Sequence, residues 1–280
     1  MIPVYIISGF LDSGKTEFIT YTISQPYFQS KKDTLLIVCE EGENEYDASL
    51  LKKSRTIMEV IEDEEDLTSQ KLIALEKKYK PGRIIIEFNG MWMLKDVKFP
   101  WHWKVEQQIT MINGKTFANY FTNMKSLVAE QIRGSELIIM NRCDGMEDKI
   151  AGYKRNIKAL NQQAEIIFEN ATGEMNVTLE EDLPYDLNAD PIVLDDNGYG
   201  FWYIDILDNL ERYNGKTIQF VANVLHPPKF PKGYFVPGRM AMTCCAEDMA
   251  FLGYACKYDR AIELEQKSWI KITAKIAIEY

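Results

Sequence analysis

Residues 9–16 of this chain, Gly-Phe-Leu-Asp-Ser-Gly-Lys-Thr, constrain its fold more than any other segment. The apolar, β-branched run 3–7 before them predicts a buried strand, and residues 17–21 can continue as a helix. The segment has the complete G-x-x-x-x-G-K-[ST] spacing of a phosphate-binding P-loop, in the strand–loop–helix setting that this motif requires. The sequence therefore predicts a site for the phosphates of a nucleotide.

The residue types in this loop suit phosphate chemistry. The glycines let the backbone curl until several N–H groups point into one concavity, and the following helix adds its positive dipole end. We expect Lys15 to reach the β- and γ-phosphates and the Thr16 hydroxyl to bind Mg²⁺. The residues expected to hold the nucleotide here are Gly9, Asp12, Ser13, Gly14, Lys15 and Thr16.

The composition excludes several classes of protein. The chain has 280 residues, enough for one large or two modest domains, and 46% of them are hydrophobic. Its net charge of −10 argues against a general nucleic-acid or anionic-membrane surface. No apolar run reaches the roughly 18 residues that span a bilayer, and the start of the chain lacks a basic, cleavable leader. We expect a cytoplasmic protein whose five cysteines are reduced.

Two further apolar strands end in acidic residues. Residues 34–39 are followed by Glu40, Glu41 and Gly42, whose carboxylates could meet a metal or orient a water molecule near the phosphate loop. Residues 83–86 lead into Glu87, with Gly90 three positions later. A P-loop protein needs its second Mg²⁺ contact and a backbone N–H for the γ-phosphate at such a strand end. We therefore expect Glu87 to hold Mg²⁺ and the Gly90 N–H to face the γ-phosphate.

A fourth apolar strand, 136–140, delivers Asn141, Arg142 and Asp144 at its carboxyl end, where α/β proteins bind ligands. Asp144 can accept two hydrogen bonds from the ring N–H and exocyclic amine of guanine, whereas adenine offers no such donor pair. Asn141 can brace the loop, and the stem of Arg142 can lie along the base plane. Since an unpaired buried carboxylate is costly, this pattern indicates guanine recognition.

The alternation of strands and helices up to about residue 172 predicts an α/β fold with a mostly parallel, doubly wound sheet. Its Gly-Phe-Leu P-loop, acidic-glycine stretch, Glu87-x-x-Gly90 and Asn141-Arg142-x-Asp144 resemble the metallochaperone P-loop GTPases, especially the CobW-like branch. The resemblance implies binding of GTP and GDP, slow Mg²⁺-dependent hydrolysis, and coupling to delivery of a metal, often zinc or cobalt.

The chain departs from that family's pattern at three points. Arg142 stands where the family has lysine, and Cys39-Glu40-Glu41-Gly42 replaces Asn-Glu-x-Gly. The family's Cys-x-Cys-Cys metal loop is missing, because residues 48–80 contain no cysteine. The resemblance therefore extends to the GTPase but supplies no metal-binding loop in this domain.

The remainder of the chain has a different character. Residues 173–191 are polar and acidic and predict a linker between a GTPase domain, 1–172, and a second domain, 192–280. Apolar runs at 200–206, 217–224, 239–244, 252–257 and 269–278 predict short strands, and hence a small, OB-like β-barrel. Residues 238–248 resemble the C-terminal domain of YcgQ-like proteins, which are membrane proteins associated with permease-like partners.

Cys244 and Cys245 are the sharpest feature of this second region. Adjacent residues of an extended strand point to opposite faces, so both can bind one metal only where the chain bends. Together with Cys256 and His226 they could form a thiolate–imidazole zinc site. The alternative is that Cys244 and Cys256 are small core residues.

Three functions remain open from the sequence. The first is a CobW-like GTPase that couples hydrolysis to metal handling or to a permease, with Lys15, Glu40, Glu41 and Glu87 as the catalytic candidates. The second is a nucleotide-dependent regulatory module with negligible turnover, and the third is an ATP-using P-loop protein. The expected partners are a guanine nucleotide, a metal-receiving client or a membrane permease, and a second copy of the chain.

Overall fold

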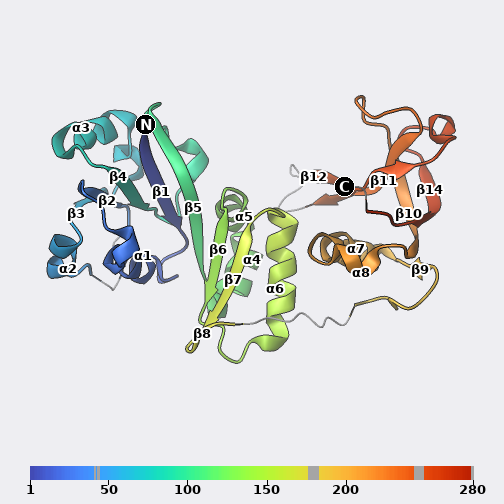
Figure 1. Cartoon of the computed structure of the whole chain (residues 1–280), viewed down its shortest axis with the longest axis horizontal. Coiled ribbons are helices and arrows are strands. Elements are labelled where there is room, and N and C mark those ends of the chain that lie inside the picture. The colour runs from blue at the N-terminus through green and yellow to red at the C-terminus, as the bar shows by residue number, and fades with distance from the viewer. Residues whose placement is uncertain (41, 43–44, 176–182, 243–248, 279–280) are drawn as a thin grey trace. The chain divides into compact units, whose positions relative to one another are not determined.

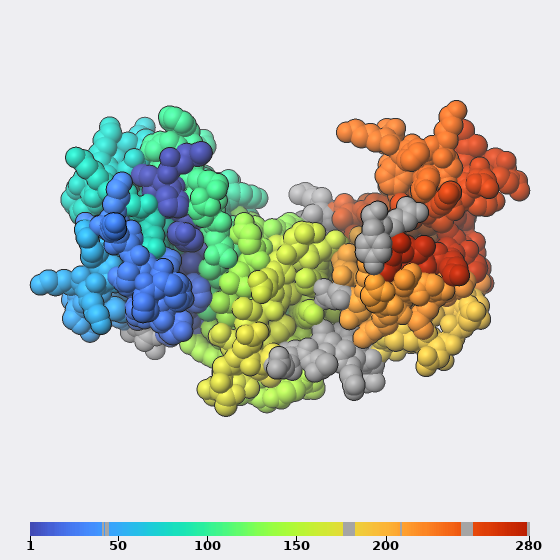
Figure 2. Space-filling model, viewed as in Figure 1, coloured from blue at the N-terminus to red at the C-terminus, as the bar shows by residue number. Residues whose placement is uncertain are grey.

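The computed structural model describes residues 1–40, 42, 45–175, 183–242 and 249–278. The chain divides into two compact units, residues 1–178 and 179–280. The first runs from blue to yellow and the second from yellow to red (Figure 1), and the space-filling view in Figure 2 uses the same colours. Each unit is described by itself.

The first unit is built on an eight-stranded sheet in the order β3-β2-β4-β1-β5-β6-β7-β8. All pairings among β1 to β7 are parallel, and only the short β8 runs antiparallel to β7. These pairings confirm the predicted mostly parallel sheet. The strands are β1 (Ile2–Ser8), β2 (Thr34–Val38), β3 (Thr56–Val60), β4 (Arg83–Glu87), β5 (Trp103–Asn113), β6 (Leu137–Asn141), β7 (Glu165–Asn170) and β8 (Gly173–Glu174).

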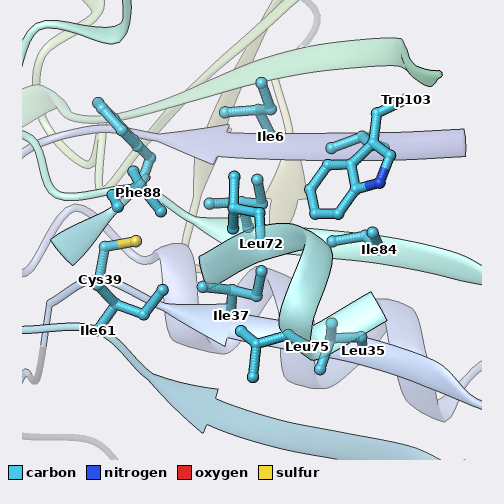
Figure 3. Packing of buried hydrophobic residues seen from close by; sticks show 13 residues of the cluster. Ile6, Leu35, Ile37, Cys39, Ile61, Leu72, Leu75, Ile84, Phe88 and Trp103 are labelled. Carbon is cyan, nitrogen blue, oxygen red and sulfur yellow. The ribbon is translucent and has the colours of Figure 1, made fainter. Parts of the chain in front are cut away.

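Helices cover both faces of this sheet, so its central strands are apolar at nearly every position. On β2, Leu35 and Ile37 pack in one core cluster with Leu72 and Leu75 (Figure 3), whereas Leu36 packs in another with residues of α1. The strands β1 and β4 alternate in the same way. The helices are α1 (Lys15–Ser24), α2 (Ala48–Lys53), α3 (Ser69–Tyr79), α4 (Gly114–Asn123), α5 (Lys125–Arg133) and α6 (Glu147–Leu160).

The second unit contains a six-stranded sheet in the order β12-β11-β10-β14, with β13 paired to β11 and β9 paired to β10. The pairings among described residues do not join β12 to β14, so the barrel remains a prediction. The elements are β9 (Ile192–Val193), α7 (Asp196–Asp208), α8 (Leu210–Tyr213), β10 (Thr217–Leu225), β11 (Tyr234–Met242), β12 (Met249–Gly253), β13 (Cys256–Lys257) and β14 (Trp269–Lys275).

The predicted strand at residues 200–206 is wrong, because this segment is the middle of α7. Asp195 caps the helix, accepting a hydrogen bond from the Gly198 N–H at 2.6 Å. The helix buries Tyr199, Trp202 and Ile206 against the sheet. Its aromatic and β-branched composition favours a strand, but the cap and the i, i+3, i+7 spacing of the buried side chains give a helix.

The predicted linker lies partly within both units. Gly173 and Glu174 form β8, which pairs with β7 in the first unit. Tyr185 and Leu187 pack against the core of the second unit, and the Tyr185 hydroxyl lies 2.6 Å from that of Tyr213. Among the described residues, no helix is long and apolar enough to cross a membrane.

Cys39, which follows β2, can be used to test whether reagents in solution reach the core of the first unit. It is 1% exposed and belongs to the cluster drawn in Figure 3. Burial, with the nearby carboxylates Glu87 and Glu40, raises the pKa of its thiol to about 12. At pH 8 its thiolate fraction is therefore about a thousandfold below that of a cysteine with the ordinary pKa of 9.0.

We predict that Cys39 resists alkylation by iodoacetamide at pH 8 in the folded protein and reacts readily after unfolding in urea. Peptide mass spectrometry after timed labelling measures both rates at this one residue. Equal rates in the folded and unfolded protein would contradict the buried position of the thiol.

Candidate functional site

The P-loop joins the carboxyl end of β1 to α1, and its backbone needs glycine at two positions. Gly9 has a φ of +137°, and a Cβ there would lie 2.3 Å from the Met111 carbonyl oxygen. Gly14 has a φ of +97°, and a Cβ there would lie 2.6 Å from Asn141 Nδ2. Because Gly14 is also the N-cap of α1, no capping side chain covers the first-turn N–H groups. They form a ready site for an anion.

Lys15 is 4% exposed and has three acceptors around its ammonium group. Nζ donates to the carbonyl oxygens of Gly9 at 2.8 Å and Phe10 at 3.0 Å, and to the Glu40 carboxylate at 2.5 Å. The Glu40 side chain is 12% exposed, so the ion pair is largely buried. A phosphate that reaches Lys15 must therefore take the place of the Glu40 carboxylate.

Glu87 lies at the end of β4 beside the P-loop. Its Oε1 accepts from the Thr16 hydroxyl at 2.7 Å, and its Oε2 accepts from the Tyr46 hydroxyl at 2.5 Å. Burial raises the pKa of Glu87, although both hydroxyl bonds favour the charged form. Burial and the Glu87 carboxylate also raise the pKa of Tyr46. Thr16 and Glu87 thus bring together two hard oxygen atoms of the kind that Mg²⁺ binds.

Gly90 lies directly against the P-loop. A Cβ at this position would be 2.4 Å from the Gly9 carbonyl oxygen and 2.7 Å from the Phe10 Cα, so only glycine fits at position 90. Its own carbonyl oxygen accepts from Gln131 Nε2 at 2.8 Å. These contacts hold the Gly90 backbone beside the P-loop.

The end of β6 is joined to the P-loop by two side chains. Asn141 Nδ2 donates to the Ser13 carbonyl oxygen at 2.8 Å, and Arg142 Nη1 donates to the Asp12 carbonyl oxygen at 2.6 Å. Asp144 is exposed, and its Oδ1 accepts from the Ala171 N–H at 3.0 Å. Two of the three residues predicted to bind the base, Asn141 and Arg142, are therefore hydrogen-bonded to the P-loop.

Two buried polar atoms of the site have no hydrogen-bond partner among the described residues, Ser13 Oγ and Asn141 Oδ1. Ser13 lines a small cavity of about 20 Å³ between the P-loop and α4–α5, which is room for about one water molecule. Buried polar groups are normally paired, so these atoms are the points where a ligand or a water would bond.

The predicted zinc ligands are described only in part. Cys244 and Cys245 lie outside the described residues, as does Glu41, which the sequence predicts for the nucleotide site. His226 Nε2 lies 2.9 Å from the Leu264 carbonyl oxygen, and Cys256 packs partly buried against the cluster around Phe235. Within the described part of the chain, no three His, Cys, Asp or Glu side chains form a group that could hold a metal.

Three residues of the site were not predicted from the sequence: Tyr46, Gln131 and Ala171. Tyr46 comes six residues after Glu40, in a stretch that reads as an acidic loop. Gln131 lies within a helix, and Ala171 offers only its backbone N–H. Their contacts arise from the tertiary fold, and no local motif marks them.

Two family models match the chain. The family model for the CobW/HypB/UreG nucleotide-binding domain matches residues 3–168, and the DUF1980 C-terminal domain matches residues 170–280. The second match corresponds to the region that resembles YcgQ-like proteins. No curated protein sequence matches the chain.

The solved structures that resemble the chain do so at low identity. The hydrogenase maturation factor HypB from Archaeoglobus fulgidus is 18% identical, with a TM-score of 0.45, and the match covers 62% of this chain and 84% of that one. Zn(II)-bound YjiA GTPase from E. coli is 14% identical, with a TM-score of 0.42 and coverage of 97% and 93%. HypB from Helicobacter pylori in complex with nickel is 14% identical, with a TM-score of 0.43 and coverage of 61% and 80%.

The family match spans more than half of the chain and contains the P-loop, the Glu87–Thr16 pair and the Asn141–Asp144 segment. By this match the chain belongs to the CobW/HypB/UreG family of P-loop GTPases.

Proposed function

We propose that this protein binds GTP and GDP, hydrolyses GTP slowly with Mg²⁺, and uses its nucleotide state to handle a metal or to act on a partner. One observation carries the proposal: the hydrogen bond from Asn141 Nδ2 to the Ser13 carbonyl oxygen joins the base-reading segment to the phosphate loop. A surface that combines the two suits a whole nucleotide, whereas a P-loop alone would suit any phosphate.

The base end of this surface supports guanine as the ligand. The Ala171 N–H donates to one oxygen of Asp144, which restrains the position of the carboxylate. In that position the carboxylate accepts from the ring N–H and the exocyclic amine of guanine. The Arg142 guanidinium bonds to the Asp12 carbonyl oxygen, so its side chain extends from the base segment toward the phosphate loop.

The phosphate end supports a triphosphate with Mg²⁺. Thr16 and Glu87 would hold the ion, since their oxygen atoms lie 2.7 Å apart at the edge of the P-loop. When bound, Mg²⁺ neutralises charge on the β- and γ-phosphates. Lys15 donates to the same phosphates once Glu40 has left it, and the Gly90 N–H donates to the γ-phosphate. Positioning by these groups is the main source of rate in phosphoryl transfer.

Glu40 is the best-supported candidate for orienting the attacking water. It pairs with Lys15 at 2.5 Å, so an incoming phosphate would release its carboxylate next to the γ-phosphate. We predict that Glu40→Gln lowers kcat by about a hundredfold, because the base is removed, yet tightens GDP binding, because the competing anion is gone. Single-turnover hydrolysis and GDP titration measure the two effects.

Glu41→Gln is the matched control for this prediction, since it removes the neighbouring carboxylate. If Glu40→Gln leaves kcat unchanged and Glu41→Gln lowers it, Glu41 has the role proposed for Glu40. A wild-type protein that binds GTP without turnover would instead support the nucleotide-dependent regulatory module.

We predict that Asp144→Ala lowers the ratio of GTP to ATP affinity by at least about a hundredfold, because the acceptor proposed for the guanine donor pair is lost. Competition of each nucleotide with a fluorescent GDP analogue measures the ratio. Asp148→Ala removes an exposed carboxylate four residues further on and should leave the ratio unchanged. An unaltered preference in Asp144→Ala, or a preference for ATP in the wild type, would refute the base-reading role.

We further propose that zinc or cobalt couples to the nucleotide site, and that the second unit holds the metal through His226, Cys256, Cys244 and Cys245. Membership of a metal-handling GTPase family supports the coupling, and the thiolate–imidazole donor set suits zinc. A membrane permease that binds the second unit is the alternative target of the nucleotide state.

We predict that Zn²⁺ changes the GDP affinity of the wild-type protein and that the double variant His226→Ala, Cys256→Ser abolishes this effect. Calorimetric titration with GDP, with and without Zn²⁺, measures it. His102→Ala, which alters the only other histidine, is the control. A GDP affinity that is indifferent to Zn²⁺ and Co²⁺ in the wild type would remove metal coupling and leave the permease as the proposed target.

A further inference from the structure

We infer that Gln131 is a positioning residue that fixes the Gly90 backbone for the γ-phosphate, and so sets the preference of this protein for the triphosphate over the diphosphate. The inference rests on the proposed function, because it concerns how the same site distinguishes its two nucleotide states. Gln131 lies on α5, ten residues before Asn141, and belongs to none of the predicted nucleotide-binding motifs.

The contact itself is direct and buried. Gln131 is 5% exposed, and its Nε2 donates to the Gly90 carbonyl oxygen at 2.8 Å. On its other side, Gly90 touches the P-loop, where even a Cβ would be 2.4 Å from the Gly9 carbonyl oxygen. The Gly90 backbone is thus held between the P-loop and one amide side chain.

The backbone N–H groups of the two residues after Gly90 are occupied. The Met91 N–H donates to Asn89 Oδ1 at 2.9 Å, and the Trp92 N–H donates to the Asn89 carbonyl oxygen at 3.2 Å. Gly90 is a buried residue, and no hydrogen bond joins its N–H to an acceptor among the described residues. This N–H is therefore available to an acceptor on a ligand.

Gln131 is itself fixed by a network of buried polar groups. Its main-chain carbonyl oxygen accepts from Thr110 Oγ1 at 3.1 Å, Ser135 Oγ at 2.9 Å and Gln108 Nε2 at 3.2 Å. Thr110 Oγ1 lies 2.7 Å from the hydroxyl of Ser8, the last residue of β1 before the P-loop. The network therefore connects the helix position that carries the Gln131 side chain, and through it Gly90, to β1, the strand that leads into the P-loop.

The composition of this network argues for positioning. Its members Ser8, Thr110, Gln108, Gln131 and Ser135 are each between 0% and 7% exposed, inside an otherwise apolar core. Apolar side chains of similar volume would fill the space without the cost of removing polar groups from water. Hydrogen bonds are directional, so they can fix the orientation of the Gly90 peptide group, which apolar packing cannot do.

The test compares the affinities of GDP and the non-hydrolysable analogue β,γ-imido-GTP, each with Mg²⁺, for the full chain and its variants. In Gln131→Met we expect the analogue to bind about five- to tenfold more weakly, the effect of one misplaced hydrogen bond, and GDP affinity to change less than twofold. Gln131→Glu keeps the side-chain volume but cannot donate when ionised, so it should show the same selective loss.

Gln108→Met is the matched control. It removes a glutamine of the same network. Gln108 donates to the main-chain carbonyl oxygen of Gln131, and no hydrogen bond joins it to Gly90. We expect it to lower the thermal midpoint of unfolding and to leave the ratio of analogue to GDP affinity unchanged. A purely structural role for Gln131 would make the two methionine variants alike.

Two results would overturn the inference. In a folded Gln131→Met or Gln131→Glu protein, an unchanged affinity ratio would show that Gln131 does not act on the γ-phosphate. An equal loss of GDP and analogue binding would show general damage to the P-loop. Absence of guanine-nucleotide binding in the wild type would refute the proposed function itself, and this result is seen before any variant is made.

Discussion

The first unit depends on the placement of one buried positive charge. The Lys15 ammonium is held by the Gly9 and Phe10 carbonyl oxygens and by Glu40, so the P-loop is closed around its own lysine. A buried charge is tolerated only when it is paired and hydrogen-bonded, and here the acceptors come from the loop backbone and from the end of β2. The apolar sheet beneath supplies the rigid support, because its parallel strands deliver all these groups to one edge.

Two contacts occupy the groups that we propose for the phosphates and Mg²⁺. Glu40 pairs with Lys15, and Tyr46, six residues later, donates to Glu87. In the proposed complex, phosphate and Mg²⁺ would compete with these two contacts directly. The free energy of binding would then be reduced by the cost of breaking both contacts.

The sequence was most informative where function depends on a local motif. The P-loop, Glu87 and the Asn141–Asp144 segment each follow an apolar strand, and parallel strands place such segments together, so their convergence could be predicted. The contacts of Tyr46, Gln131 and Ala171 could not be predicted. Each is made with a residue far away in the sequence, and no local motif marks either partner's place in the contact. In the second unit, the apolar run 200–206 favours a strand by composition, and only the Asp195 cap and the helical period of its buried side chains indicate α7.

The bond between Asn141 and the Ser13 carbonyl oxygen has a thermodynamic consequence for how the site distinguishes ligands. In the proposed complex, groups that fix the base segment would also fix the P-loop, since coupling between two linked sites is reciprocal. Binding of the base would then also order the P-loop. A nucleotide with the wrong base would meet a less well-formed phosphate site, so discrimination would extend beyond the atoms that read the base.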